Sequence, residues 1–121
     1  MQNFRDLKVW AKAHALVLAI YSATEPFPVT ERYGVTSQMR RAAASIPSNI
    51  AEGCGRSSNA DLGRYLHIAL GSASELEYFV LLARDLRYLS DPTHDTIVAD
   101  VQEVKRMLAT LIARVTSGTD N

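Results

Sequence analysis

The sequence contains a single cysteine, Cys54, so no disulfide can form within the chain and nothing points to an oxidising compartment. The N-terminus, MQNFRDLKVW, lacks the apolar core and small-residue cleavage site of a signal peptide. No apolar run approaches the roughly 20 residues that a membrane span needs. These absences predict a cytoplasmic protein with no membrane partner. With 121 residues, the chain is predicted to form a single domain over residues 1–121, with a frayed tail at about residues 116–121.

The sequence also lacks an excess of either charge, because 13 basic and 13 acidic side chains cancel. A dedicated nucleic-acid binder usually carries a strongly basic balance, so this class is disfavoured. The charges are nevertheless distributed unevenly. Residues 1–64 hold eight Lys/Arg and five Asp/Glu, whereas residues 65–121 hold five and eight. The gradient is either random drift or a means of steering subunits together or presenting a basic side to a polyanion.

No segment shows the strict alternation of a half-buried strand, and four segments show helical periodicity instead. Four amphipathic helices must bury their apolar stripes together, so the fold class is predicted to be all-α, an antiparallel up-down-up-down four-helix bundle. The four predicted apolar faces, in chain order, are Leu7, Trp10, Ala11, His14, Val17, Leu18 and Tyr21; Met39, Ala43, Ile46, Ile50 and Cys54; Leu62, Leu66, Ala69, Ala73, Leu76, Val80 and Ala83; and Ile97, Val101, Val104, Leu108, Leu111 and Ile112.

Local signals mark where these helices begin and end. The first helix is predicted to end before the segment EPFP, because proline cannot continue it. Ser58 and Asp61 resemble a capping pair, and the third helix is predicted to run from Asp61 to about Tyr88. Asp91 is the predicted N-cap of the fourth helix, with Pro92 at the first helical position.

The second helix contains Pro47 in its interior, where proline removes a backbone hydrogen bond and costs about 3 kcal/mol. The apolar positions keep their helical phase across Pro47, so the helix is predicted to bend there without ending. The carbonyl of Ala43 then loses its usual donor, and the side chains of Ser45, Ser48 and Asn49 are nearby groups able to bond freed backbone. The bend either wraps the helix around the bundle or opens a polar pocket between helices.

A polar stripe also continues through Pro47 at spacings of three and four residues. In the third helix Gly71 lies in a run of small residues, where another backbone can come close. Close approach would bring Glu75 within reach of Arg40 or Arg41 and form an arginine–carboxylate pair. We therefore predict a polar network that fixes the position of the bent helix, made of Arg41, Ser45, Asn49, Glu52 and Glu75.

Enzyme and metal-site signatures are missing from the sequence. His14, His67 and His94 lie on three different predicted helices at no metal-ligand spacing, and a position on the apolar face favours a core role for His14. Cys54 has no base near it in the sequence, which makes a nucleophilic role weak. The segment GCGRSS follows a helix, whereas a phosphate-binding loop follows a strand. No catalytic residue, cofactor or metal is predicted.

Three segments resemble a bacterial four-helix-bundle family first named for an open reading frame within intervening sequences of 23S rRNA genes. They are DLKVWAKAHALVLAIY, FPVTERYGVTSQMRRAAASIPSNIAEGCGR and YLHIALGSASELEYFVLLARDL, and the resemblance covers roughly residues 6–89. Its most specific part is the run Gln38, Arg41, Ala42, Ser45, Ile46, Pro47, Asn49, Ile50, Ala51, Glu52 and Gly53. The resemblance implies a four-helix bundle, homo-oligomers with a ring of five subunits, and no enzymatic activity. A related branch, the accessory protein of diversity-generating retroelements, binds a reverse transcriptase and nucleic acid through a basic surface.

These observations predict a non-enzymatic, homo-oligomeric interaction or scaffold protein that pairs with itself and with an unidentified protein. The alternative is an accessory protein that binds RNA or DNA through a basic face gathered by the oligomer. Partner or nucleic-acid contacts are predicted at Lys8, Lys12, Arg32, Arg40 and Arg56. A third hypothesis is a small-molecule pocket beside Pro47.

Overall fold

The computed structural model describes residues 2–117, and every structural statement below concerns this part of the chain. It contains helices and no strand within those residues, which confirms the predicted all-α class of four helices. Two short 3₁₀ helices precede α1 and α2. The elements are η1 (Phe4–Asp6), α1 (Lys8–Thr24), η2 (Val29–Glu31), α2 (Val35–Cys54), α3 (Asn59–Asp85) and α4 (Asp91–Ser117).

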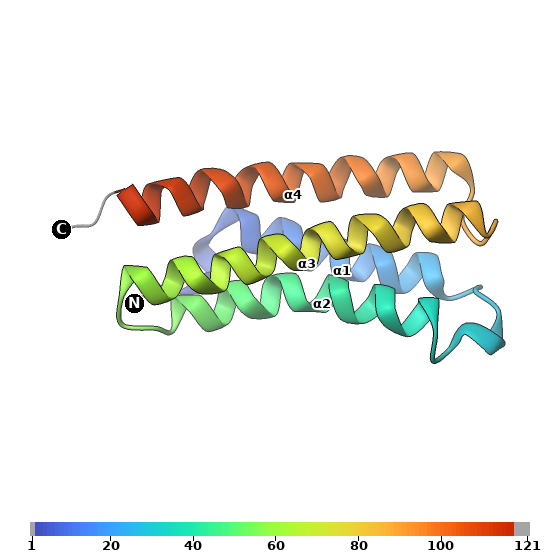
Figure 1. The fold of residues 1–121 in the computed structure, drawn as a ribbon, viewed down its shortest axis with the longest axis horizontal. Coiled ribbons are helices and arrows are strands. Elements are labelled where there is room, and N and C mark those ends of the chain that lie inside the picture. Colours follow the sequence, from blue (N-terminus) through green and yellow to red (C-terminus); the bar gives the residue numbers. More distant parts are fainter. Residues whose placement is uncertain (1, 118–121) are drawn as a thin grey trace.

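The four long helices pack around one shared core. Each helix contacts two others, so that α1 lies against α2 and α4, and α3 lies against α2 and α4. The chain turns back at each connection between consecutive helices (Figure 1). The two connections that join α2 to α3 and α3 to α4 are short, and each makes the next helix pack against the one before it.

Three of the four predicted apolar faces form this core. On α2 and α4 every predicted residue is buried, and on α3 every one is buried except Leu62, which is half-buried. The prediction for α1 is confirmed only in part, because Leu7, Trp10 and Val17 are half-buried against the core, whereas Ala11, His14, Leu18 and Tyr21 are exposed. The buried residues of α1 form a second stripe about 120° around the helix from the predicted one, at about 100° per residue. They are Val9, Ala13, Leu16, Ile20 and Thr24.

The helix ends differ from prediction by a few residues. Ser58 Oγ accepts a hydrogen bond of 3.1 Å from the Asp61 N–H, which confirms the capping pair, and α3 then ends at Asp85. The N-cap predicted at Asp91 is wrong by one position, because Ser90 Oγ accepts from the Thr93 N–H. The helix α4 continues through Ser117, so residues 116 and 117 do not belong to the predicted frayed tail, and residues 118–121 lie outside the described residues.

The connection between α1 and α2 contacts the turn between α3 and α4. The Phe27 and Tyr88 rings lie 5.4 Å apart, and the Tyr88 hydroxyl donates a hydrogen bond of 2.9 Å to Glu31 Oε2. This bond to a carboxylate raises the pKa of Tyr88 above its ordinary value. Arg87, next to it, has a φ of 67°, so the turn places a residue other than glycine in the left-handed region.

Candidate interaction surfaces

The helix α2 continues as a helix through Pro47, and polar side chains join it to α3 on this stretch. The hydroxyls of Ser45 and Ser72 share a hydrogen bond of 2.7 Å. The Asn49 amide nitrogen donates to Ser45 Oγ at 3.0 Å and to the Ser45 carbonyl at 2.8 Å, and Ser48 Oγ donates to that carbonyl as well. These side chains therefore bond the carbonyl of Ser45 and not that of Ala43. A bend at Pro47 stays a prediction.

A second group of contacts lies at the end of α2. An Arg56 guanidinium nitrogen is 2.6 Å from Glu52 Oε2 and 2.8 Å from the Tyr65 hydroxyl on α3. A Cβ on Gly53 would lie 2.9 Å from Tyr65 Cβ and 3.0 Å from Leu62 Cδ1, so a glycine is needed for α2 and α3 to come this close. The sequence did not identify Tyr65, because the residue type and position of a tyrosine near the start of a helix do not show which side chain its hydroxyl will bind.

The predicted network therefore divides into separate parts. Ser45 and Asn49 interact with each other, whereas Glu52 interacts with Arg56. Arg41 and Glu75 are both exposed and form no ion pair within residues 2–117. The ion pair predicted between Glu75 and Arg40 or Arg41 is thus absent from this part of the protomer, because Arg40 turns toward α1 and no cation there comes within 4.0 Å of Glu75.

Three of the five cations predicted to contact a partner also have a contact within the protomer. Arg40 Nε donates 2.8 Å to Thr24 Oγ1, and its guanidinium lies 4.6 Å from the centre of the Tyr21 ring. Arg56 is held by Glu52 and Tyr65, as described above, and Lys12 lies 3.8 Å from Asp100. The other two predicted contacts, Lys8 and Arg32, are exposed.

Three residues of the apolar stripe predicted on α1, Trp10, His14 and Val17, border a groove between α1 and α2, which we call the α1–α2 groove. Its volume is about 290 Å³. The Trp10 and His14 rings stack at 5.1 Å with 6° between their planes, and Phe4 lies 4.9 Å from Trp10. His14 is exposed, so the predicted core role is wrong. The groove is lined by Phe4, Trp10, His14, Val17, Ala44, Pro47, Ser48 and Ala51.

A second apolar surface lies on α3. This helix is long and apolar enough to cross a membrane by length and composition alone, a test that core helices of soluble proteins also pass. Only 33% of its most apolar 18-residue stretch is buried in the protomer. We call the residues Ile68, Gly71, Glu75 and Tyr78 the outer face of α3, since they recur at helical spacing and are all exposed.

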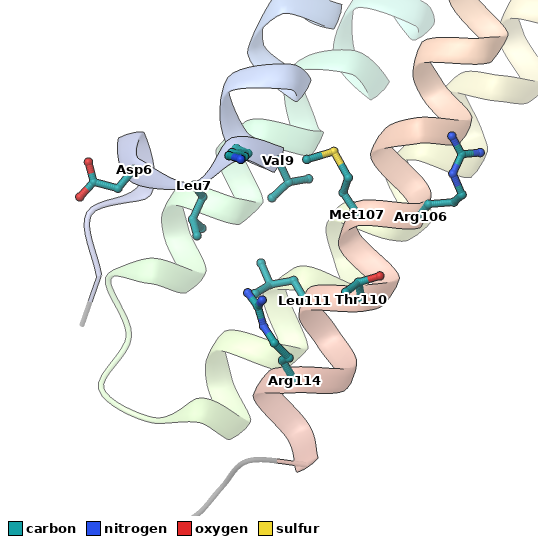
Figure 2. A pocket seen from close by; sticks show the side chains of 9 residues that line it. Asp6, Leu7, Val9, Arg106, Met107, Thr110, Leu111 and Arg114 are labelled. Atoms are coloured by element: carbon teal, nitrogen blue, oxygen red, sulfur yellow. The ribbon is translucent and has the colours of Figure 1, made fainter.

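A cavity of about 450 Å³ lies between the start of α1 and the end of α4 (Figure 2). It exists because α1 has 17 residues and α4 has 27, so the last turns of α4 extend past the beginning of α1. Its lining combines apolar side chains with the cations Lys8, Arg106 and Arg114, and Arg106 is paired with Glu103 at 2.7 Å. The cavity therefore follows from unequal helix lengths.

The side chains with catalytic or metal-binding chemistry are dispersed. Burial raises the pKa of the Cys54 thiol above its ordinary value, which disfavours the nucleophilic thiolate. His94 is buried and its Nδ1 lies 2.9 Å from Asp95 Oδ1. Within residues 2–117 no three His, Cys, Asp or Glu side chains come close enough together to hold a metal ion.

Comparison with known proteins assigns the family. The model of the 23S rRNA-intervening sequence protein family matches residues 5–110. The chain belongs to this family. A crystal structure of a protein of unknown function from the S23 ribosomal protein family of Bacteroides thetaiotaomicron VPI-5482 is similar, with a TM-score of 0.80 and 26% sequence identity, over 87% of this chain and 95% of that chain. No protein with a curated description matches. This member of the 23S rRNA-intervening sequence protein family therefore shares its fold with a protein described as having unknown function.

Proposed function

We propose that the protein is a non-enzymatic, cytoplasmic, homo-oligomeric bundle that serves as an interaction or scaffold module. The observation that carries this proposal is the exposure of large apolar side chains on α1 and α3. Leu18 is 59% exposed and Tyr78 is 57% exposed. Apolar surface that stays outside the core of a protomer is typical of an interface with another protein.

The two apolar surfaces are different from each other, which favours a ring. Contact between two different surfaces repeats from subunit to subunit and closes into a ring when the rotation allows it. The charges support such a contact, because residues 1–64, which include α1 and α2, carry about +3 and residues 65–121 carry about −3. A ring of five subunits is the form that the family resemblance implies.

Nucleic-acid binding has less support than self-association. Arg40 and Arg56 have close partners within the protomer, so fewer cations are free to neutralise phosphates. An RNA fragment titrated at about 50 and 200 mM salt separates the two functions, because affinity through many phosphates falls steeply with salt. Strong binding that weakens at least tenfold would favour the nucleic-acid function.

The test is the mass of the native assembly, measured by light scattering and native mass spectrometry over about a hundredfold range of protein concentration. We expect an oligomer, and we expect Leu18→Ser and Tyr78→Ser to lower its mass at a given concentration while the circular dichroism stays helical. The control is Val29→Ser, which alters a side chain that is more exposed, at 78%, but lies outside both surfaces.

A monomer at every concentration would contradict the proposal. So would an oligomer that Val29→Ser and Leu18→Ser weaken equally, because the apolar surfaces would then have no special part in it. Co-sedimentation with lipid vesicles is measured in parallel, since α3 is long and apolar enough to cross a membrane by length and composition alone. Binding to vesicles by the monomer would assign the apolar surface of α3 to lipid.

A further inference from the structure

Two exposed residues of opposite charge, one on an apolar surface and one beside the other, form no ion pair within residues 2–117. Glu75 belongs to the outer face of α3, and Arg41 lies on the outer face of α2. Two half-buried cations of the same region do find partners, as Arg40 does with Glu25 and Arg56 does with Glu52. Within the described part of the protomer, neither the Arg41 guanidinium nor the Glu75 carboxylate therefore has an oppositely charged partner.

The surroundings of Glu75 fit a face that another helix covers. Ile68 and Tyr78, seven residues before and three after it, are 42% and 57% exposed. Gly71, one turn before Glu75, is exposed, and a Cβ at this position would meet no atom within 4 Å. Glycine costs helix stability relative to alanine, and nothing inside the described part of the protomer requires it here. Its missing side chain leaves room for a neighbour outside the protomer.

The surroundings of Arg41 fit the opposite side of such a contact. Ala44 and Ser48, three and seven residues further along α2, line the α1–α2 groove, so Arg41 lies at its edge. On the aromatic side of the groove, His14 is exposed and stacks on Trp10, which is half-buried. This surface thus combines an apolar groove with an exposed cation, whereas the outer face of α3 combines apolar side chains with an exposed carboxylate.

We propose that the outer face of α3 binds the α1–α2 groove of a second copy of this chain, and that Glu75 of one copy pairs with Arg41 of the other. The proposal rests on the self-association proposed above and names the contact that makes it. An arginine–carboxylate pair surrounded by apolar side chains is shielded from water, so loss or reversal of one partner leaves a charge uncompensated. The pair would also fix which two surfaces meet.

The test exchanges the two charges. We expect Arg41→Glu and Glu75→Arg each to weaken association at least about tenfold, because each places like charges at the contact. A mixture of the two single variants is expected to form heavier species that contain both chains, since the two carboxylates of one variant then face the two guanidinium groups of the other. The double variant is expected to associate as the original chain does. Native mass spectrometry of isotope-labelled chains identifies the mixed species.

Controls distinguish this contact from its alternatives. Arg114→Glu changes the net charge equally at an exposed position outside both surfaces, and it is expected to leave association unchanged. Rescue in the double variant without mixed species would mean that Arg41 and Glu75 pair within one chain, which overturns the proposal. An oligomeric parent chain whose mass both single variants leave unchanged overturns the proposal too, and self-association then stands. A monomeric parent chain contradicts the proposed function itself.

Gly71→Ala supplies an independent measurement, because it adds one methyl group without changing charge. The substitution is expected to raise the melting temperature of the protomer, since alanine favours helix and the added Cβ meets no atom. The same methyl group is expected to weaken association at the close contact. A more stable protomer that associates as tightly as before would show that α3 is not approached there, and the proposal would fail.

Discussion

The helices α4 and α1 are both amphipathic, yet sequence periodicity identifies the buried face of one and not of the other. All six apolar residues predicted to be buried on α4 are buried, from Ile97 to Ile112. On α1 none of the seven is fully buried, three are half-buried against the core, and the fully buried residues form a different stripe. The apolar residues of α4 fall on one face, whereas those of α1 fall on two. Periodicity shows that a segment is a helix, but a helix with two apolar faces has two surfaces to cover.

The largest effect is expected on α4, where one face carries all the packing. Leu108 is fully buried, and Leu108→Ala is expected to lower the free energy of unfolding by about 3 kcal/mol, because it removes apolar contacts and leaves a cavity. Urea unfolding followed by circular dichroism measures the change. A decrease in the free energy of unfolding below about 1 kcal/mol would mean that the core around α4 is loosely packed, and α4 would then not differ from α1 in how well its apolar face is buried.

Two substitutions at neighbouring positions of α1 distinguish the buried stripe from the exposed one. Ile20 is fully buried, so Ile20→Ala is expected to cost about 2–3 kcal/mol of protomer stability. Leu18 is exposed, so Leu18→Ala is expected to cost less than about 0.5 kcal/mol when unfolding is measured at low protein concentration. Equal decreases in the free energy of unfolding would show that both stripes of α1 pack inside the protomer. The difference between α1 and α4 would then disappear.

The smallest effect concerns the ion pairs that α4 makes with its two neighbours. Lys105 donates a hydrogen bond of 3.0 Å to Glu77 on α3 and thereby lowers the pKa of Glu77 below its ordinary value. A carboxylate with a lowered pKa stabilises the fold above its unfolded-state pKa, and this contribution is lost as the pH falls through the folded-state pKa. Glu77→Gln is therefore expected to cost about 0.5 kcal/mol at pH 7 and nothing in acid.

The matched substitution is Asp100→Asn, which removes the longer and more exposed pair between Asp100 and Lys12 of α1. Its effect on unfolding is expected to be too small to measure at any pH, because exposed pairs contribute little. Thermal unfolding from about pH 3 to pH 8 compares the two variants. A cost for Glu77→Gln that persists in acid would show that its amide disrupts packing and that the charge of Glu77 is not the cause.

Most of the fold was predictable because apolar residues at helical spacing depend only on the local chain. Proline and a serine cap also mark ends locally, although Ser90 and Asp91 are equally good caps by type and only the structure distinguishes them. The candidate surfaces were harder to predict. Arg40 and Arg56 look like free cations in the sequence, and their partners, Thr24 and Tyr65, lie on neighbouring helices. Which cations lack a partner depends on how each helix is rotated about its axis, and the sequence pattern does not determine this rotation for α1.

The hydrogen bond between Tyr88 and Glu31 holds together two helical hairpins at one end of the bundle. The helices form two hairpins, α1 with α2 and α3 with α4, and the peptide chain joins the hairpins only through the short loop between α2 and α3. At the opposite end, the Tyr88 hydroxyl and the Phe27 ring fasten them without a covalent link. The hairpins also pack together through α2 with α3 and through α1 with α4, so local unfolding is expected to begin at the end where no loop joins them. Separation of the hairpins at that end is also the first step by which two chains would exchange them.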